Sequence, residues 1–269
     1  MAPLSRLDHV IIAVKNLDAA AATYRKLGFT LTPRGLHEGK GTGNHCIMFK
    51  DSYIELLGIV DEVGAKGRLA ERVNARGEGG MGIAYGADDA DKIAAALRAA
   101  SIAVEDPNDL ARPLDLDGKR EMVRFRNVMM PNLSLPNVMQ FVCTHLTPEL
   151  TRARHEWQLH PNGATGIAEV VVAANTIDPY WDELERLYDN STSKTAVTLA
   201  ARETLEANHG AALRGAPPDG VVMLRITVNE PDATSAMLEM AKVPHREEDG
   251  VVTVPASAAH GVALEFAED

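Results

Sequence analysis

The sequence is poor in cysteine. Its 269 residues include two, Cys46 and Cys143, and neither belongs to a CxxC pair. A zinc site built from thiolates and a framework of disulfide bonds both need more cysteines than this. Such sparse cysteine usage is typical of a reducing compartment, so we expect a cytoplasmic location.

Positive charge is also scarce, with 27 Lys and Arg residues against 38 Asp and Glu residues and a formal net charge of -11. Binding to a phosphate backbone is driven by clustered cations, so nucleic acid is not an expected partner. The sequence has no run of about 20 apolar residues. Its first residues also lack the apolar core of a signal peptide. We therefore expect a soluble protein without a membrane anchor.

A hydrophobic content of 45% is enough to form a buried core, and the length allows one large domain or two smaller ones. Apolar periodicity and turn residues predict a strand, a helix and three further strands in the first 60 residues. The expected strands cover residues 7–14, 29–32, 44–50 and 53–59, and the expected helix covers 19–27. Asp51 and Ser52 form the two-residue turn of a hairpin.

This βαβββ order recurs along the chain, which fixes the architecture more firmly than local propensity does. The second pass has its helix at residues 88–100 and strands at 82–85, 102–105, 120–128 and 137–143. The third begins with a strand at 167–174 and a helix at 178–188, but 191–220 shows no clear strand pattern. The fourth has its helix at 233–241 and strands at 221–228, 243–245, 251–254 and 261–267. We predict an α+β fold of about four βαβββ modules.

The modules fall into two halves, residues 1–145 and 167–269, separated by a linker at 146–166. The linker contains a short expected helix at 148–157 and the turn sequence HPNG at 160–163. Proline cannot continue a helix and Asn-Gly readily adopts positive φ, so a simple turn is the first interpretation of this tetrapeptide. A role for His160 in substrate binding is the alternative.

Two motifs in the first module, LDHV on its first strand and YIELLG on its last, resemble the vicinal oxygen chelate superfamily, which includes glyoxalase I and the extradiol dioxygenases. More narrowly, His37 followed by GTGN at 41–44, together with HPNGA at 160–164, resembles the glyoxalase-like domain group of bacterial proteins. These motifs cover residues 4–60 and 140–165, and the rest of the chain matches by pattern alone.

The resemblance implies that pairs of modules form incomplete barrels, one in each half of the chain, around a divalent metal. The ligands would come from the first and last strands of each module. His9 and Glu55 match these positions in the first module. In the second module Gln140 matches Glu55, whereas Gly82 matches His9 and offers no ligand. A His, Glu and Gln set suits Zn, Fe(II), Mn, Ni or Co.

Strand periodicity also sorts the residues around Glu55, because residues two apart share a face of a sheet. The hairpin turn is expected to pair Met48 with Glu55. Asn44, Cys46 and Met48 would then line the face of Glu55, with Cys46 as a packing residue, whereas His45 would point away.

Three further residues are candidates for chemistry or binding. His37 lies in a Gly-rich loop and is a candidate third ligand or general base. Thr42 and Asn44 are candidate hydrogen-bond partners of a substrate oxygen, and Met48 and His160 complete the expected binding residues. The carboxylate of Glu55 is an alternative proton carrier.

The C-terminal half matches the ligand positions less well. Glu169 corresponds to His9 in the third module and Met223 does so in the fourth, where Glu265 corresponds to Glu55. Two carboxylates alone make a poorly selective metal site, so we expect this half to act as a support or a lid.

The favoured hypothesis is a metal-dependent lyase or isomerase acting on a small molecule with two adjacent oxygens. An extradiol dioxygenase is an alternative, weakened because the ligand set has no second histidine. A metal-free protein that sequesters a hydrophobic or aromatic ligand is another, favoured by Gly82 and Met223. The resemblance is also compatible with a homodimer. Few basic residues other than Arg34, Lys40 and Lys50 lie near the expected cleft, so a highly anionic substrate is not expected unless a metal supplies positive charge.

Overall fold

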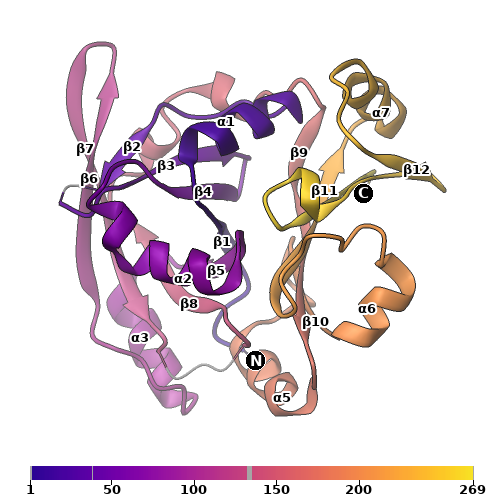
Figure 1. The fold of residues 1–269 in the computed structure, drawn as a ribbon. Coiled ribbons are helices and arrows are strands. Elements are labelled where there is room, and N and C mark those ends of the chain that lie inside the picture. Colours follow the sequence, from indigo (N-terminus) through magenta and orange to yellow (C-terminus); the bar gives the residue numbers. More distant parts are fainter. Residues whose placement is uncertain (1, 38, 132–134, 269) are drawn as a thin grey trace.

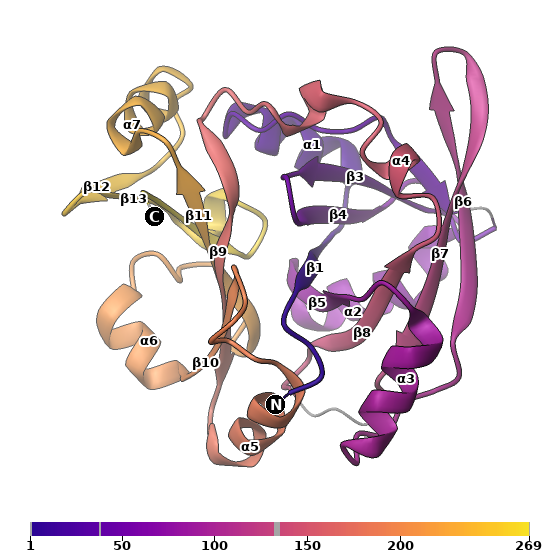
Figure 2. The same cartoon turned by 180° about the vertical axis from the view of Figure 1, so that it is seen from behind.

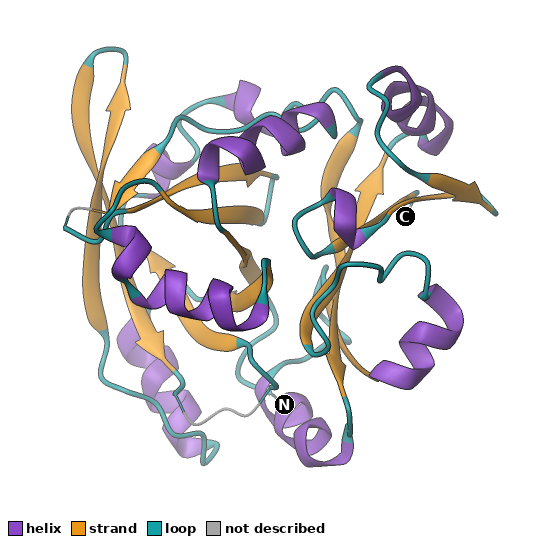
Figure 3. Cartoon of the chain, in the orientation of Figure 1, coloured by secondary structure: helices purple, strands orange, loops and turns teal. Residues whose placement is uncertain are grey.

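The chain forms an α+β structure built on two mixed sheets, which confirms the fold class predicted from the sequence. A computed structural model describes residues 2–37, 39–131 and 135–268. The first sheet curves around one side of the molecule and the second stands beside it, with helices packed on both (Figures 1 and 3). Within the described ranges, no helix is long and apolar enough to span a membrane.

Eight strands form the first sheet over the described residues, in the order β2-β3-β4-β1-β5-β8-β7-β6. They are β1 (Leu7–Val14), β2 (Gly35–His37), β3 (Thr42–Met48), β4 (Tyr53–Ile59), β5 (Gly79–Gly86), β6 (Asn108–Leu116), β7 (Lys119–Met129) and β8 (Met139–His145). The antiparallel pair β1 and β5 lies at the centre, and the last strand of each module runs parallel to its first. Two βαβββ modules thus meet back to back, and the long β6–β7 hairpin projects beyond the sheet (Figure 1).

Three helices accompany this sheet, α1 (Leu17–Lys26), α2 (Arg68–Arg76) and α3 (Ala90–Ala99), and a 3-10 turn at Gly64–Lys66 precedes α2. The Asn16 side chain caps α1 by accepting a hydrogen bond from the backbone N–H of Ala19 at 3.0 Å. Small alanines on its inner face let α1 approach the sheet closely. Tyr24 on the same face is fully buried, and its hydroxyl donates to the carbonyl of Ala259 in the C-terminal half at 3.1 Å.

Six strands form the second sheet over the described residues, in the order β10-β9-β11-β14-β13-β12. They are β9 (Ala164–Ala174), β10 (Ala196–Ala201), β11 (Gly220–Val228), β12 (Arg246–Glu248), β13 (Val251–Val254) and β14 (Ala263–Ala267). The helices of this half are α5 (Asp178–Leu187), α6 (Arg202–His209) and α7 (Pro231–Met240). Strand β10 and helix α6 lie within residues 191–220, where no clear strand pattern is visible in the sequence (Figure 2).

Several expected elements are placed differently. The strand expected at 29–32 is wrong, and β2 begins at Gly35 instead. At this position the Thr32 hydroxyl accepts a hydrogen bond from the backbone N–H of Cys46. In a regular pair of strands, that N–H would donate to a backbone carbonyl instead. The strands expected at 102–105 and 243–245 are also wrong, since β6 and β12 begin after these residues. The expected helix at 148–157 divides into α4 (Pro148–Thr151) and a 3-10 turn at His155–Gln158.

The two halves share one hydrophobic core, which includes Val10 and Ile83 from the first sheet and Val221 and Leu224 from the second. Strands β5 and β11 approach each other closely at Gly80. A Cβ atom on Gly80 would lie 2.4 Å from the Val221 Cβ atom and 2.5 Å from its carbonyl oxygen. This position therefore depends on the absence of a side chain.

We predict that Gly80→Ala lowers the free energy of unfolding by about 1 to 3 kcal/mol, because the added methyl group must displace backbone atoms. Urea denaturation of both proteins measures the difference. Gly166→Ala is the matched control, because a Cβ atom there meets nothing within 4 Å. Equal stability of the two variants would contradict the proposed close approach.

An ion pair also joins the halves. The Nδ1 atom of His260 donates to Oε2 of Glu78 at 2.8 Å, and the backbone N–H of Lys15 donates to Oε1 at 2.7 Å. Burial raises the pKa of the Glu78 carboxyl, but the hydrogen bonds from His260 and Lys15 and their positive charges outweigh burial and lower its pKa. The ionised form of Glu78 is therefore favoured in the folded state.

Because the pKa of Glu78 is depressed on folding, its ionisation stabilises the protein above the unfolded-chain value of about 4.5, and this contribution is lost as the pH falls through the folded value. We predict that Glu78→Gln lowers the stability at pH 6. The difference from the parent protein should shrink as the pH is lowered towards 3. Urea titrations over this range test the prediction, and a difference that grows with acidity would have the wrong sign.

Candidate active site

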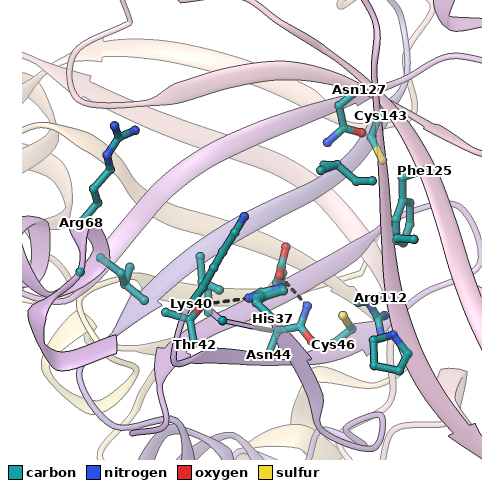
Figure 4. Close-up of a pocket in the computed structure, with 18 of the residues that line it drawn as sticks. His37, Lys40, Thr42, Asn44, Cys46, Arg68, Arg112, Phe125, Asn127 and Cys143 are labelled. Atoms are coloured by element: carbon teal, nitrogen blue, oxygen red, sulfur yellow. Dashed lines mark hydrogen bonds between the residues drawn. The ribbon is translucent and has the colours of Figure 1, made fainter. Parts of the chain in front are cut away.

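A cavity of about 1150 Å³ lies inside the curve of the first sheet. Strands β1, β3, β4 and β8 form its floor, and the β6–β7 hairpin and the loop before α2 form its walls (Figure 4). His9, Asn44 and Glu55 give the floor a polar centre, and Leu57, Phe125 and Phe141 are among the apolar side chains around it.

Asp8 and His9 are neighbours in sequence whose side chains nevertheless meet. The register of β1 against β5 shifts between Leu7 and His9, which leaves Asp8 as the extra residue of a β-bulge. Oδ1 of Asp8 therefore accepts a hydrogen bond from Nδ1 of His9 at 2.6 Å. Both residues are buried, at 6% and 4% exposure.

His145 at the end of β8 is the second partner of this carboxylate. Its Nε2 atom donates to Asp8 at 3.0 Å from Oδ2 and 3.2 Å from Oδ1. Burial raises the pKa of Asp8, but the hydrogen bonds from His145 and His9 and the charges of both imidazoles outweigh burial and hold this pKa well below its ordinary value. Asp8 is thus a carboxylate shared by two imidazoles.

Cys143 lies beside this pair. Burial, together with the negative charges of Asp8 and Glu55, raises the pKa of the Cys143 thiol well above its ordinary value, so the thiol is protonated. Asp8, Cys143 and His145 each offer a possible metal-ligating atom, and these atoms lie within 4.8 Å of one another. Within the described ranges this is the one group of three such atoms so close together.

The other nitrogen of His9 faces Glu55. Nδ1 donates its hydrogen to Asp8, so in the neutral ring Nε2 carries the lone pair. This Nε2 atom lies 3.6 Å from Oε2 of Glu55. The ring of His9 stacks on Tyr53 with 4.4 Å between centroids, and Phe141 meets its edge. Oε1 of Glu55 accepts from Nδ2 of Asn44 at 2.6 Å, so the two side chains that face each other are both fixed.

His37 and Thr42 lie side by side on the wall of the cavity (Figure 4), and Glu55 is close enough to His37 to influence its pKa. Nδ1 of His37 lies 3.0 Å from Oγ1 of Thr42. Burial lowers the pKa of His37, and the negative charge of Glu55 opposes that shift only in part. His37 is therefore a neutral imidazole at neutral pH, as a base requires. Of the sequence-predicted site residues, the structure brings His9, His37, Thr42, Asn44 and Glu55 to one cavity.

Gln140 is not brought together with His9 and Glu55. It pairs with Ile83 and lies on the opposite face of the sheet, where its Oε1 atom accepts from the Tyr85 hydroxyl at 2.8 Å. Phe141, the next residue, faces the cavity instead. A one-residue difference in alignment reverses the face of every strand residue, which is why the sequence comparison chose Gln140.

Met48 and His160 also lie outside the cavity lining. The hairpin pairs Met48 with Tyr53 and Cys46 with Glu55, two residues from the expected register, and Met48 joins an apolar cluster with Trp157. A shift of two residues keeps the same side chains on the same face, so His45 points away from Glu55 as expected. The Nδ1 atom of His45 is hydrogen-bonded to the Thr32 carbonyl.

Both ring nitrogens of His160 are hydrogen-bonded to the backbone of the first module. Its Nδ1 atom accepts from the backbone N–H of Thr30 and its Nε2 atom donates to the Met48 carbonyl, each at 3.0 Å. Phe29 and Phe49 pack edge-on against its ring. Burial lowers the pKa of His160, in keeping with a neutral ring that joins the linker to the first module.

Sequence reasoning missed Asp8, Tyr53, Cys143, His145 and Arg112, all of which lie in or beside the cavity. The Asp-His doublet within LDHV was an available signal for the first of these. Periodicity argued against it, because adjacent strand residues normally point to opposite faces.

The C-terminal half has a different arrangement at Glu169 and Glu265, the positions that correspond to His9 and Glu55. Arg225 on β11 places Nη1 3.0 Å from Glu169 and Nη2 3.1 Å from Glu265. His209 of α6 lies 3.0 Å from the second oxygen of Glu265. The two carboxylates are thus paired with cations of this chain.

Comparison with known proteins supports the architecture. A family model described as a glyoxalase-like domain matches residues 7–188. No curated protein matches the sequence. The crystal structure of a hypothetical protein from Staphylococcus aureus aligns with 98% of this chain and 99% of its own, at 13% identity and a TM-score of 0.68, which shows a shared fold.

Two methylmalonyl-CoA epimerase structures align with the chain in part. The Streptomyces coelicolor protein is 25% identical and covers 53% of this chain and 99% of its own, with a TM-score of 0.41. The Mycobacterium tuberculosis protein is 20% identical and covers 54% of this chain and 90% of its own, with a TM-score of 0.41.

We predict that Asp8→Asn lowers the free energy of unfolding by about 2 to 4 kcal/mol, because two buried imidazoles lose a charged acceptor. Urea denaturation measures this loss. Asp109→Asn, which changes an exposed carboxylate paired with Arg126, should stay within about 0.5 kcal/mol of the parent. Nitrogen-15 spectra of the histidine side chains should also show that His9 no longer favours the Nδ1–H tautomer. An unchanged tautomer would count against the role assigned to Asp8.

Proposed function

This chain belongs to the glyoxalase-like domain family, and on that premise we propose that it is a metal-dependent lyase or isomerase acting on a small molecule with two adjacent oxygens. The observation that carries the proposal is the pair formed by His9 and Glu55. Their facing atoms, Nε2 and Oε2, lie 3.6 Å apart at the floor of a large cavity, and each side chain is held by a separate partner.

The chemistry of these donors fits a divalent ion. A metal-binding histidine commonly donates its second N–H to a carboxylate, as His9 does to Asp8. Two donors 3.6 Å apart can both reach one ion at ligand distances of about 2.0 to 2.2 Å. A nitrogen and an oxygen donor suit Zn, Fe(II), Mn, Ni or Co, and two protein ligands leave positions for two oxygens of a substrate.

The Asp8, Cys143 and His145 group fits an ion less well. Asp8 already accepts two imidazole N–H groups, and the Cys143 thiol would have to lose its proton despite two neighbouring carboxylates. In the proposal, the carboxylate of Asp8 orients His9.

A bound divalent ion would supply Lewis-acid polarisation of a substrate oxygen and so make an adjacent C–H bond more acidic. His37 is the candidate acceptor of that proton: when its Nδ1 atom donates to Thr42, the Nε2 atom of the neutral ring carries the lone pair, and burial favours the neutral ring. Asn44 holds Glu55 in place, and Phe125 and Phe141 exclude water. Proton transfer next to a carbonyl is common to lyases and isomerases, so both remain in the proposal.

A second candidate function is a metal-free protein that binds and sequesters a small molecule. It is favoured by the second module, where Gly82 stands at the position of His9 and Phe141, which cannot ligate a metal, faces the cavity. In this case His9 and Glu55 would bind the ligand by hydrogen bonds alone.

Metal analysis of full-length protein purified without chelator distinguishes these candidates. We predict that the protein retains one divalent ion, and that His9→Gln and Glu55→Gln each weaken its binding by at least about 100-fold. Glu62→Gln is the matched control, because Glu62 is another carboxylate of the cavity lining but lies at its exposed mouth.

Three outcomes would contradict the assignment. Absence of metal after incubation with each of the five ions would favour the sequestering protein. Equal metal content in all variants would place the ion elsewhere. Loss of metal in Cys143→Ser but not in His9→Gln would assign it to the Asp8, Cys143 and His145 group.

A further inference from the structure

We infer that the ligand of this cavity is an amphipathic organic anion, with an acidic group held by Arg112 and an apolar body against the exposed apolar side chains at the mouth of the cavity. The assignment of this anion as the substrate rests on the proposed function. The binding of the anion is a separate property that the cavity lining supports directly.

Charge is the first observation. Among the described residues of the lining, Lys40, Lys66, Arg68 and Arg112 are cationic, and Glu55 and Glu62 are anionic. The chain as a whole carries a net charge of -11. An excess of positive charge in a concave site of an acidic protein concentrates anions there.

These four cations also have no carboxylate within ion-pair distance among the described residues. Arginines elsewhere behave differently, and Arg6, Arg34 and Arg98 each contact an aspartate. Over the part of the chain that the structure describes, the cavity cations are thus available to a ligand.

Arg112 is the least exposed of the four and reaches inward from β6. A Cβ atom on Gly35 would lie 3.0 Å from its Nη1 atom, so the missing side chain of Gly35 gives the guanidinium room. In Figure 4 it lies beside Cys46 and Asn44, near His37. A partly buried guanidinium without a counter-ion is costly, and an anionic ligand would remove that cost.

The apolar part of the lining indicates the rest of the ligand. Val63, Leu110 and Met122 line the cavity and remain 60%, 41% and 40% exposed. Exposed apolar side chains gathered at the mouth of a cavity are typical of a binding surface. The volume also exceeds the upper end, about 1000 Å³, of ordinary small-molecule pockets, so the cavity has room for an apolar body.

An unpaired polar group inside the lining also points to a ligand. The side-chain carbonyl oxygen of Asn127 has no hydrogen-bond partner among the described residues, although the residue is only 8% exposed. Buried amides are normally satisfied, and this oxygen, which has almost no accessible surface, would meet a hydroxyl or N–H group of the ligand after a rotation of the Asn127 side chain. The ligand would then carry a second polar group in addition to its acidic one.

Isothermal titration of the full-length protein with octanoate, octanamide and acetate tests the inference. EDTA is present throughout, so that no metal contributes to binding. We expect octanoate to bind about tenfold more tightly than octanamide, because only the carboxylate makes a charge-assisted hydrogen bond. Octanoate should also bind more tightly than acetate, since acetate has no apolar body.

Arg112→Gln should remove the preference for octanoate, and Arg112→Lys should retain part of it. Arg124→Gln is the matched control, because Arg124 belongs to the same hairpin but is exposed and outside the cavity lining. A second measurement needs no variant. Raising KCl from about 50 mM to about 500 mM should weaken octanoate binding and leave octanamide binding unchanged.

Equal affinities for octanoate and octanamide, or an effect of Arg124→Gln as large as that of Arg112→Gln, would overturn the inference. Affinity for acetate equal to that for octanoate would overturn its apolar part. If Arg112→Gln does not fold, a lack of salt dependence in the parent protein would overturn the inference instead. Because these titrations contain EDTA, failure of the metal assignment leaves their result unchanged, and the two proposals are tested separately.

Discussion

The polar floor of the cavity depends on one buried carboxylate, that of Asp8. Removing a carboxylate from water costs several kcal/mol, and here charge-assisted hydrogen bonds from His9 and His145 offset that cost. The bond to His9 also fixes which of its nitrogens faces Glu55. The bond to His145 ties the first strand of one module to the last strand of the other, so the same group fixes the geometry of the site and the closure of the sheet.

The two halves of the chain differ at the positions that correspond to His9 and Glu55. In the N-terminal half an imidazole nitrogen and a carboxylate face each other in an open cavity. In the C-terminal half the guanidinium of Arg225 lies between Glu169 and Glu265, and α6 contributes His209. A side-chain cation that satisfies both carboxylates leaves little affinity for a metal ion. The matching positions of the two halves therefore differ: one pair faces a cavity, and the other forms an internal ion cluster.

The sequence predicted His9 and Glu55 through the family resemblance, and strand periodicity predicted which of their neighbours share a face with Glu55. Glu55 faces the cavity and His45 points away, because β3 and β4 pair in a regular register where residues two apart share a face. Predictions of which face a side chain occupies were wrong where the strand pairing is irregular or where the alignment between modules is uncertain. The bulge at Asp8 turns a side chain that an ideal strand would direct outward, and a one-residue error placed Gln140 instead of Phe141 in the site. The Asp-His doublet was a signal for the first departure, but periodicity argued against using it, and the second has no local sequence signal.

The charge of the cavity could not be read from composition either, since net charge is a sum over the whole surface and binding depends on the local potential. The sequence identified Lys40 because it lies next to the Gly-rich loop of the first module. Arg112 and Arg68 belong to the β6–β7 hairpin and the start of α2, and only the folding of these segments over the floor brings them to the same cavity (Figure 4). An acidic protein can thus present a cationic site, and a metal is not the only source of positive charge for an anionic ligand.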